Sequence, residues 1–515
     1  MSMEAILKSE KNKLIRGTII LTIAGIISRI IGFVYKIYLA DFLGAKLLGI
    51  YQLIFPVYGI CFTIYGAGLQ TAISQYVGEY SDNTGKYNKK QLRVLSVGTV
   101  AGLLLSLILA FLVYTNSDYI AGNLLLEKSC SQYIKILTII FPFCSVSACI
   151  SGFYYGVQNA SSPAIAQIIE QMSRVIFVIP LCMFISHSSE QSCIIALYGM
   201  AVGEISGFLF NILRLLMLLR KRYTRQSAIS QNNIVSKLLK TAFILTGTRL
   251  IISILHSAEA VFIPSALQKY GLSSSEALST YGILSGMSFP FILFPSAICV
   301  SFATMILPTM AKANSDKNET KIRTTVTFTT KYSLIIGWLF TTIFLFYGSD
   351  IGNMFFHNET AGEYIKILSW LCPLLYVSTT LTSIINGLGH TQYTFLITVI
   401  SLIIKIYFLI FLVPKKGISA YLIGTLISQL IITVMEIVFL KKYISYDASH
   451  FVLLPFISLI FIGVISKKLY SAFLQCCPQI PEIIIFLTCC AIITVIYAIW
   501  LLITHCIKTD EFKIS

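Results

Sequence analysis

Apolar runs of about twenty residues recur along the whole chain, and each is long enough to cross the hydrocarbon core of a bilayer. Hydrophobic residues make up 56% of the 515 positions and charged residues only 12%, and the mean hydropathy is +0.81. A soluble protein of this length would need far more charge to cover its surface. We therefore expect an all-α integral membrane protein.

Counting these runs predicts about 14 transmembrane helices. The first run is too long for the core of a signal peptide, so we expect it to stay in the membrane. The approximate limits of the expected spans are residues 14–40, 48–76, 95–114, 134–157, 163–185, 194–219, 238–267, 278–310, 332–347, 365–388, 393–412, 418–440, 451–470 and 483–504.

An internal repeat divides these spans into two sets. Residues 133–137 (YIKIL) recur letter for letter at 364–368, an offset of 231 that also carries Pro142 onto Pro373. Apolar composition explains shared residue types but not a shared register. The repeat therefore predicts two six-helix repeats followed by two C-terminal helices, a layout typical of transporters. We expect Pro142 and Pro373 to kink their helices at matching places.

The distribution of charge predicts the topology. Lys and Arg gather in alternate short connections, among them the linker 220–233, whereas most acidic loop residues lie in the others. The positive-inside rule then places both termini in the cytoplasm, and the two repeats enter the membrane from the same side. The net charge of +16 belongs to these connections, so nucleic acid is not an expected partner. The predicted regions are an N-terminal lobe (1–225), a C-terminal lobe (226–445) and two additional helices with a cytoplasmic tail (446–515).

Ionisable residues at bilayer depth are costly, so each needs a structural or functional reason. Bases at this depth outnumber acids by one, and guanidinium groups bind phosphate and carboxylate in a bidentate manner, which favours an anionic substrate. We expect Lys36 and Glu436, near span ends, to reach water by snorkelling. The candidate residues of a substrate-binding cavity are Arg29, Arg174, Arg249 and Lys405.

Glu170 and Arg174 lie four residues apart on one span, so they share a helix face and can form a structural ion pair. The repeat offers an alternative. Lys405 occupies the position of Arg174 in the second half, whereas Ser401 replaces Glu170. A base that recurs without its acid favours a cation that faces a watery cavity and receives an anion.

Other polar residues at depth have competing interpretations. His256 follows Arg249 by two helical turns and precedes Glu259, which predicts a polar stripe, and a satisfied interior histidine is favoured over a proton relay. Glu204 is flanked by glycines, so close helix packing with an internal hydrogen bond explains it at least as well as substrate or ion binding does. The candidates for ion coupling or ion pairing are Glu170, Glu204, Glu259 and His256.

The sequence contains no pattern typical of an enzyme, a metal site or a cofactor site. Most of the 13 cysteines lie inside apolar runs, where Cys behaves as a small hydrophobic residue, and none forms a CxxC pair with histidine partners. No DxD-type cluster, HExxH motif or phosphate-binding glycine loop is present. We therefore expect no catalytic residues, no metal and no cofactor.

Several short motifs, taken in their order and spacing, resemble those of a known family. They are Ser28-Arg29 with Gly32-Phe33, Ile169-Glu170-Gln171 with Arg174-Val175, Thr246-Gly247-Thr248-Arg249 with Glu259, Tyr281-Gly282 with Gly286 and Phe294-Pro295, and Asn386-Gly387-Leu388-Gly389. The chain resembles the stage V sporulation protein B group of the polysaccharide biosynthesis family. This family belongs to the multidrug/oligosaccharidyl-lipid/polysaccharide exporter superfamily and includes relatives of the lipid II flippases.

The resemblance implies a flippase of the bacterial plasma membrane that works by alternating access. Its substrate would be a polyprenyl-pyrophosphate-linked glycan precursor of peptidoglycan or polysaccharide, linked to spore cortex or cell-wall synthesis. The implied partners are this lipid-linked anionic glycan, membrane lipids and cell-wall synthesis proteins. Two alternatives stay open: a multidrug or cation antiporter of the same superfamily, and a membrane-embedded glycosyltransferase or polymerase.

Overall fold

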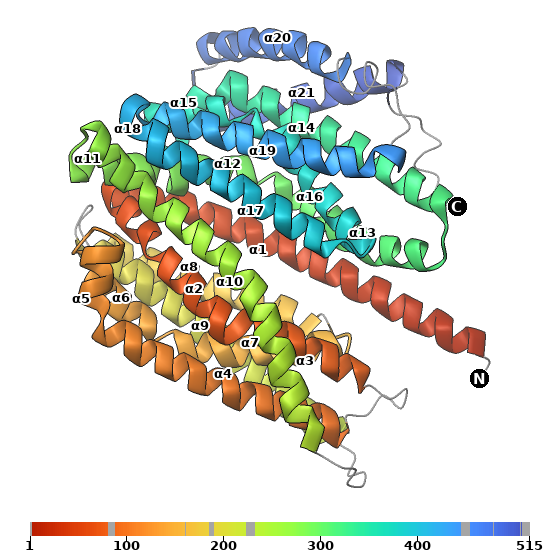
Figure 1. Ribbon diagram of the computed structural model, residues 1–515. Helices are drawn as coiled ribbons and strands as arrows, with labels where there is room; N and C mark the ends of the chain where they lie inside the picture. The colour runs from red at the N-terminus through yellow and green to blue at the C-terminus, as the bar shows by residue number, and fades with distance from the viewer. Residues whose placement is uncertain are drawn as a thin grey trace. The chain divides into compact units, whose positions relative to one another are not determined.

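Every element in the described part of the chain is a helix, and the prediction of an all-α membrane protein is confirmed (Figure 1). The helices pack into two compact units, Met1–Gly282 and Ile283–Ser515. Most of the predicted linker and the end of the predicted tail lie outside the described residues. The computed structural model describes residues 3–80, 88–159, 161–184, 190–222, 232–443, 454–476, 478–504 and 506.

The first unit contains long helices interrupted by two short π-helical segments, η1 and η2. Its elements are α1 (Met3–Leu53), α2 (Phe55–Phe62), η1 (Thr63–Ala67), α3 (Gly68–Glu79), α4 (Lys89–Thr115), α5 (Ser117–Tyr119), η2 (Ile120–Leu124), α6 (Cys130–Thr138), α7 (Phe141–Gly156), α8 (Ser161–Met183), α9 (Glu190–Arg222), α10 (Asn232–Tyr270) and α11 (Ser274–Gly282).

The second unit has the same character and ends in an additional helix pair. Its elements are η3 (Ile283–Ser288), α12 (Phe289–Leu293), α13 (Ser296–Ser315), α14 (Glu319–Phe356), α15 (Glu359–Leu368), α16 (Leu371–Gly387), α17 (Thr391–Tyr407), η4 (Phe408–Leu412), α18 (Val413–Lys416), α19 (Ile418–Leu440), η5 (Lys441–Tyr443), α20 (Leu454–Cys476) and α21 (Glu482–Ile503).

The number of membrane spans can be compared with the prediction of about 14. Within the described ranges, 11 helices are long and apolar enough to cross a membrane, or up to 13 if each of two bent pairs is one span. One of the 11 is the 57-residue stretch Ile23–Glu79. It has room for two crossings of about twenty residues each, so it can account for the first and second predicted spans.

The N-terminal caps of two helices, α4 and α14, follow the repeat seen in the sequence. The Asn88 side chain accepts a hydrogen bond from the Gln91 backbone N–H at 2.9 Å and starts α4. The Asn318 side chain accepts one from the Lys321 backbone N–H, also at 2.9 Å, and starts α14. An asparagine at this position satisfies a backbone donor that has no partner within the helix. Two helices at matching places in the two repeats thus use the same cap.

Each repeat also contains a bent helix pair with a proline just after the bend. The axes of α6 and α7 meet at 46°, and those of α15 and α16 at 53°. Pro142 is the second residue of α7, and Pro373 is the third residue of α16. Proline lacks an N–H, so it is tolerated in the first turn, where that group has no helical partner. The structure therefore places both prolines at the predicted positions of bending.

Helix α10 belongs to the first unit by its contacts, although it follows the predicted linker in the sequence. The hydroxyls of Tyr76 on α3 and Thr241 on α10 lie 2.9 Å apart. Further along α10, the Ser257 hydroxyl donates to the Pro56 carbonyl at 3.2 Å. The contact boundary thus falls after Gly282. The lobe boundary at residue 225 describes the sequence repeat and stays a prediction.

Two glycines allow α1 and α11 to cross with their backbones almost touching. A Cβ atom added at Gly282 would lie 2.0 Å from the Ala45 carbonyl oxygen and 2.6 Å from the Gly49 nitrogen. A Cβ atom added at Gly49 would lie 2.0 Å from the Leu278 carbonyl oxygen. No side chain fits between these backbones, so glycine is required on both helices.

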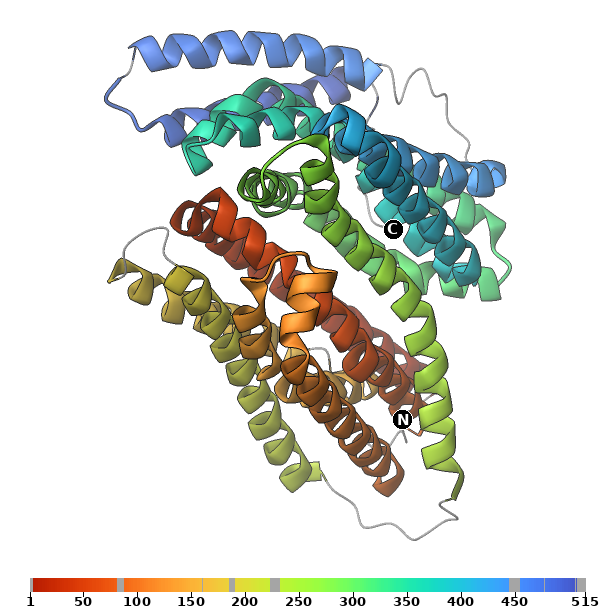
Figure 2. The same ribbon diagram turned by 60° about the vertical axis from the view of Figure 1, so that its left-hand side comes forward.

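The final helix pair, α20 and α21, lies along α14, as Figures 1 and 2 both show. The Lys467 ammonium on α20 pairs with Asp350 on α14. It also lies 5.1 and 5.0 Å from the ring centroids of Tyr347 and Tyr470, within range of a cation–π attraction. The Tyr470 hydroxyl donates to Glu482, the first residue of α21, at 2.8 Å. A polar cluster therefore fastens the additional pair to the second unit.

Lys135, within the repeated pentapeptide, has an acidic partner outside the spans. Its ammonium lies 3.7 Å from Asp118 of α5, and the Ser131 hydroxyl also donates to Asp118. The Ser131 hydrogen bond and the positive charge of Lys135 hold the pKa of Asp118 below its usual value. These contacts tie α5 to α6.

Candidate functional site

Small residues on α9 let this helix approach α8 closely. Gly199, Gly203 and Gly207 are spaced one turn apart and therefore share a face. A Cβ atom at Gly199 would lie 2.0 Å from the Val178 side chain, and one at Gly203 would lie 2.9 Å from the Glu170 carbonyl oxygen. This packing presses the backbone of α9 onto the part of α8 that contains the predicted acid and base.

Glu170 and Arg174 form an ion pair at this contact. The Arg174 guanidinium lies 2.9 Å from the Glu170 carboxylate, and their side chains are only 14% and 23% exposed, respectively. The Arg174 Nε is buried and has no hydrogen-bond partner within the described ranges. The structural ion pair that the sequence offers as one interpretation is therefore formed. The Nε donor of the Arg174 guanidinium has no described hydrogen-bond partner.

A polar cavity of about 330 Å³ opens beside this pair. Glu170 and Glu204 line it, and they are its only charged lining residues in the described part of the chain. Asn211 donates to Ser147 at 2.8 Å, while its carbonyl oxygen is buried without a described partner. Gln70 and Gln167 supply further amide groups to the wall. Two carboxylates among amides and hydroxyls can hold a proton or a cation, or bind sugar hydroxyl groups.

Arg249 joins α10 to η1 within the first unit. Its side chain is exposed, and its Nη1 donates to the Ala67 carbonyl oxygen at 2.6 Å. Ala67 ends η1, where the π-helical turn departs from the regular α-helical hydrogen-bond ladder. Here too the backbones lie close, because a Cβ atom at Gly68 would lie 2.9 Å from the Ala242 carbonyl oxygen.

The other predicted residues lie apart from this cavity. His256 and Glu259 form their own contact on α10, with Nδ1 and Oε2 3.4 Å apart. Arg29 is exposed on α1. Lys405 is half-buried on α17 of the second unit. The structure thus brings Glu170, Arg174 and Glu204 together, and it leaves Arg29 and Arg249 on other helices.

One buried acid was misjudged from the sequence. The snorkelling interpretation of Glu436 is wrong, because the residue is only 1% exposed. Its Oε1 accepts a hydrogen bond from the Thr382 hydroxyl at 2.5 Å, and its Oε2 has no partner among the described residues. Nearness to a span end suggested contact with water, but α16 and α17 pack against this turn of α19.

Comparison with known proteins identifies similar families over most of the chain. Residues 14–314 match the family described as polysaccharide biosynthesis protein, and residues 261–411 match the family described as MatE. The stage V sporulation protein B of Bacillus subtilis (strain 168) is 24% identical over 514 residues, which cover 98% of each chain. The lipid II flippase MurJ of the same organism is 21% identical and covers 85% of this chain, with 84% of its own length aligned.

Solved structures show the same fold. A lipid II flippase MurJ in an inward closed conformation has a TM-score of 0.64 at 16% identity, covering 94% of this chain and 100% of its own. A multidrug resistance MATE family transporter of the MOP superfamily, in an inward-facing conformation, also has a TM-score of 0.64, at 14% identity. It covers 82% of this chain and 97% of its own.

Proposed function

Because the chain belongs to the polysaccharide biosynthesis protein family, we propose that it is a membrane flippase for polyprenyl-pyrophosphate-linked glycan precursors of peptidoglycan or polysaccharide. The observation that carries this proposal is the alignment with the stage V sporulation protein B, which spans 98% of both chains. A role in spore cortex or cell-wall synthesis is part of this proposal, because that relative is named as a sporulation protein. Cell-wall synthesis proteins would then be its partners, and both termini would lie in the cytoplasm.

The C-terminal helix pair supports a flippase over a drug transporter. The MurJ structure covers 94% of this chain, whereas the MATE structure covers 82%. The pair α20 and α21 has no counterpart in the six-helix repeats, and the cluster around Lys467 anchors it firmly to α14. The relatives whose names state an activity are flippases or transporters, so we propose transport without an enzymatic step.

The residues of the first unit suggest how such a substrate would be held. Arg29 and Arg249 are exposed bases that can reach a pyrophosphate, and the amides and carboxylates beside Glu204 can bind sugar hydroxyl groups. Arg174 is already paired, so its contribution would be to orient Glu170. Lys405 is the corresponding candidate base in the second unit. Glu170, Glu204, Glu259 and His256 remain candidates for ion coupling.

Complementation in Bacillus subtilis tests this proposal. The chain is expected to restore heat-resistant spores in a strain lacking the stage V sporulation protein B, and the Arg29→Ala/Arg249→Ala variant is expected to lower spore counts at least tenfold. Loss of two charge-assisted contacts to phosphate, each about 1.5 kcal/mol or more, accounts for this effect. Lys46→Ala, an exposed base that follows the break in α1 at Gly44, is the matched control. Full activity of the double variant at normal membrane levels would contradict the assignment of these bases.

The acidic cavity favours one other candidate, an antiporter of cationic drugs. Among the described residues, two carboxylates and no base line the cavity, and residues 261–411 match MatE. If this were the function, overexpression would raise resistance to cationic dyes, and Glu204→Gln would abolish that resistance by removing the charge that attracts a cation. We expect no such resistance. Growth on dye plates, with Glu276→Gln as a control outside the cavity, decides between the two.

A further inference from the structure

Glu436 lies in a small polar site inside the second unit. It projects from α19 toward two hydroxyl residues spaced one turn apart on α16, Ser378 and Thr382. Thr382 donates to Oε1 at 2.5 Å, and Ser378 is only 6% exposed. The second carboxyl oxygen is buried and meets no hydrogen-bond donor in the described ranges.

The described surroundings of Glu436 supply no positive charge. From α17, the Tyr393 hydroxyl donates to the Met435 carbonyl at 2.9 Å, beside the acid. The lysines of the following turn, Lys441 and Lys442, are exposed, and no base of the described chain forms an ion pair with Glu436. An ionised carboxylate buried without a partner is strongly disfavoured, whereas a protonated carboxyl group is neutral. The geometry therefore favours a proton on Oε2.

The first unit contains a matching arrangement. At the offset of 231, Ser378 and Thr382 correspond to Ser147 and Ser151 of α7, which line the polar cavity together with Glu204. Glu204 and Glu436 are related by an offset of 232, and each lies on the last helix of its repeat. Both repeats thus place an acid opposite two hydroxyl residues on the bent helix. In the first unit Glu204 borders an open cavity, whereas in the second unit Glu436 is buried.

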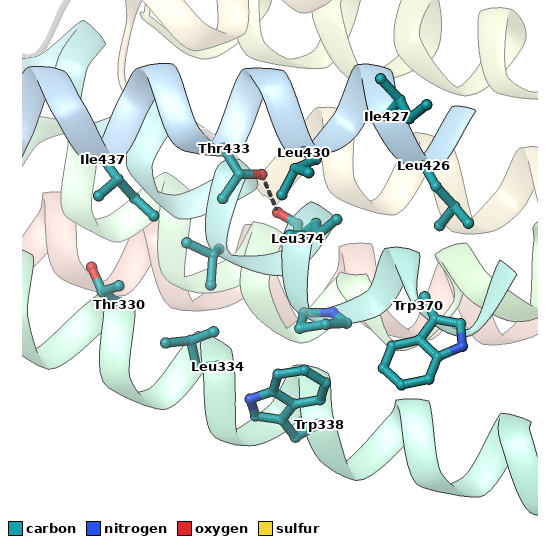
Figure 3. Close-up of a pocket in the computed structure, with 12 residues that line it drawn as sticks. Thr330, Leu334, Trp338, Trp370, Leu374, Leu426, Ile427, Leu430, Thr433 and Ile437 are labelled. Atoms are coloured by element: carbon teal, nitrogen blue, oxygen red, sulfur yellow. Dashed lines mark hydrogen bonds between the residues drawn. The ribbon is translucent and has the colours of Figure 1, made fainter. Parts of the chain in front are cut away.

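An apolar cavity next to Glu436 leaves room for movement. It has a volume of about 400 Å³ and lies between α14, α16 and α19 (Figure 3). Val377 and Ile437, the sequence neighbours of Ser378 and Glu436, line it, as does Pro373 at the bend of α16. Because the seam between α16 and α19 borders this cavity, a small shift of either helix can open a path for water to the acid.

We propose that Glu436, Ser378 and Thr382 form a proton-binding site in the second unit, and that it releases its proton when α16 and α19 move apart. On release, the Oε2–H bond breaks, the proton passes to water, and water hydrogen bonds stabilise the carboxylate. A divalent cation fits poorly, because Ca²⁺ and Mg²⁺ take about six or more oxygen ligands and this site offers only a few. The coupling of this proton to transport rests on the proposed flippase function, but the proton site itself does not.

Infrared difference spectroscopy of the purified full-length protein in lipid vesicles tests the site directly. The wild-type protein is expected to show a protonated carboxyl band that persists at neutral pH and shifts slowly in D₂O, and Glu436→Gln is expected to lose it. Thr382→Val is expected to move the band, because the carbonyl oxygen loses its hydrogen bond. Glu204→Gln is the matched control and is expected to retain this slow band. The proposal would be overturned if the band were unchanged in both Glu436→Gln and Thr382→Val. It would also be overturned if the band appeared only in the presence of sodium.

Complementation of the sporulation strain distinguishes proton binding at Glu436 from the coupling of this proton to transport. Glu436→Gln keeps the neutral shape but cannot release a proton, so spore counts are expected to fall at least tenfold while the protein folds and reaches the membrane. Wild-type activity of this variant would refute coupling through Glu436 even if the infrared band were lost. If the wild-type chain itself fails to complement while the band is present, the proposed function fails and the proton site stands.

Discussion

Replacing Arg174 with alanine is expected to destabilise the protein by about 3 kcal/mol, because removing one member of a largely buried ion pair leaves the other charge uncompensated. Glu170 would then share the cavity lining with Glu204, and none of the described residues of that lining is a base. This loss can be measured by thermal unfolding of the purified protein in detergent, with size-exclusion chromatography used to detect the unfolded fraction. A midpoint equal to that of the wild-type protein would contradict the account of the pair.

A double variant separates the structural role of this pair from a role in binding. Arg174→Ala/Glu170→Ala removes both charges, so it is expected to recover most of the stability that Arg174→Ala loses. If Arg174 serves mainly to hold Glu170, the Glu170→Ala variant and the double variant are expected to have equal activity in complementation. A double variant markedly less active than Glu170→Ala would instead indicate that Arg174 contacts the substrate itself.

Replacing Gly282 with leucine is expected to cost about 3 kcal/mol or more, since overpacking a tight contact forces backbones apart. A Cβ atom there would already lie 2.0 Å from the Ala45 carbonyl oxygen, so α11 must move away from α1. We expect a lower unfolding midpoint and a reduced amount of protein in the membrane. Fluorescence-detected size-exclusion chromatography of a tagged protein measures both quantities.

Gly25 provides the matched control for this prediction. It lies on α1, and an added Cβ atom would meet no atom within 4 Å. Gly25→Leu is therefore expected to leave stability nearly unchanged, and leucine is a better helix former than glycine. Equal losses at Gly25 and Gly282 would mean that the added side chain itself, and not the crossing of α1 and α11, governs the effect.

The repeat in the sequence relates the hydroxyl residues of the proposed proton site to residues of the first half. It does not show that Glu436 is buried beside them. Ser378, Thr382 and their counterparts Ser147 and Ser151 share the repeat offset, which the sequence analysis had found in the pentapeptide. The sequence predicts contact with water for Glu436, because it shows only that this residue lies near the end of an apolar run. Its burial depends on which helices cover that turn, and no local pattern encodes this.

The sequence by itself determined the class of fold, the order of the repeats and the bends before Pro142 and Pro373. Span length, register and proline chemistry are local properties that persist in any helical packing. Only the tertiary structure decided that Arg174 pairs with Glu170, that Arg249 holds Ala67, and that Glu436 is sealed from water. Each of these outcomes depends on how a helix is rotated and which helix lies against it, and contacts between distant segments set both.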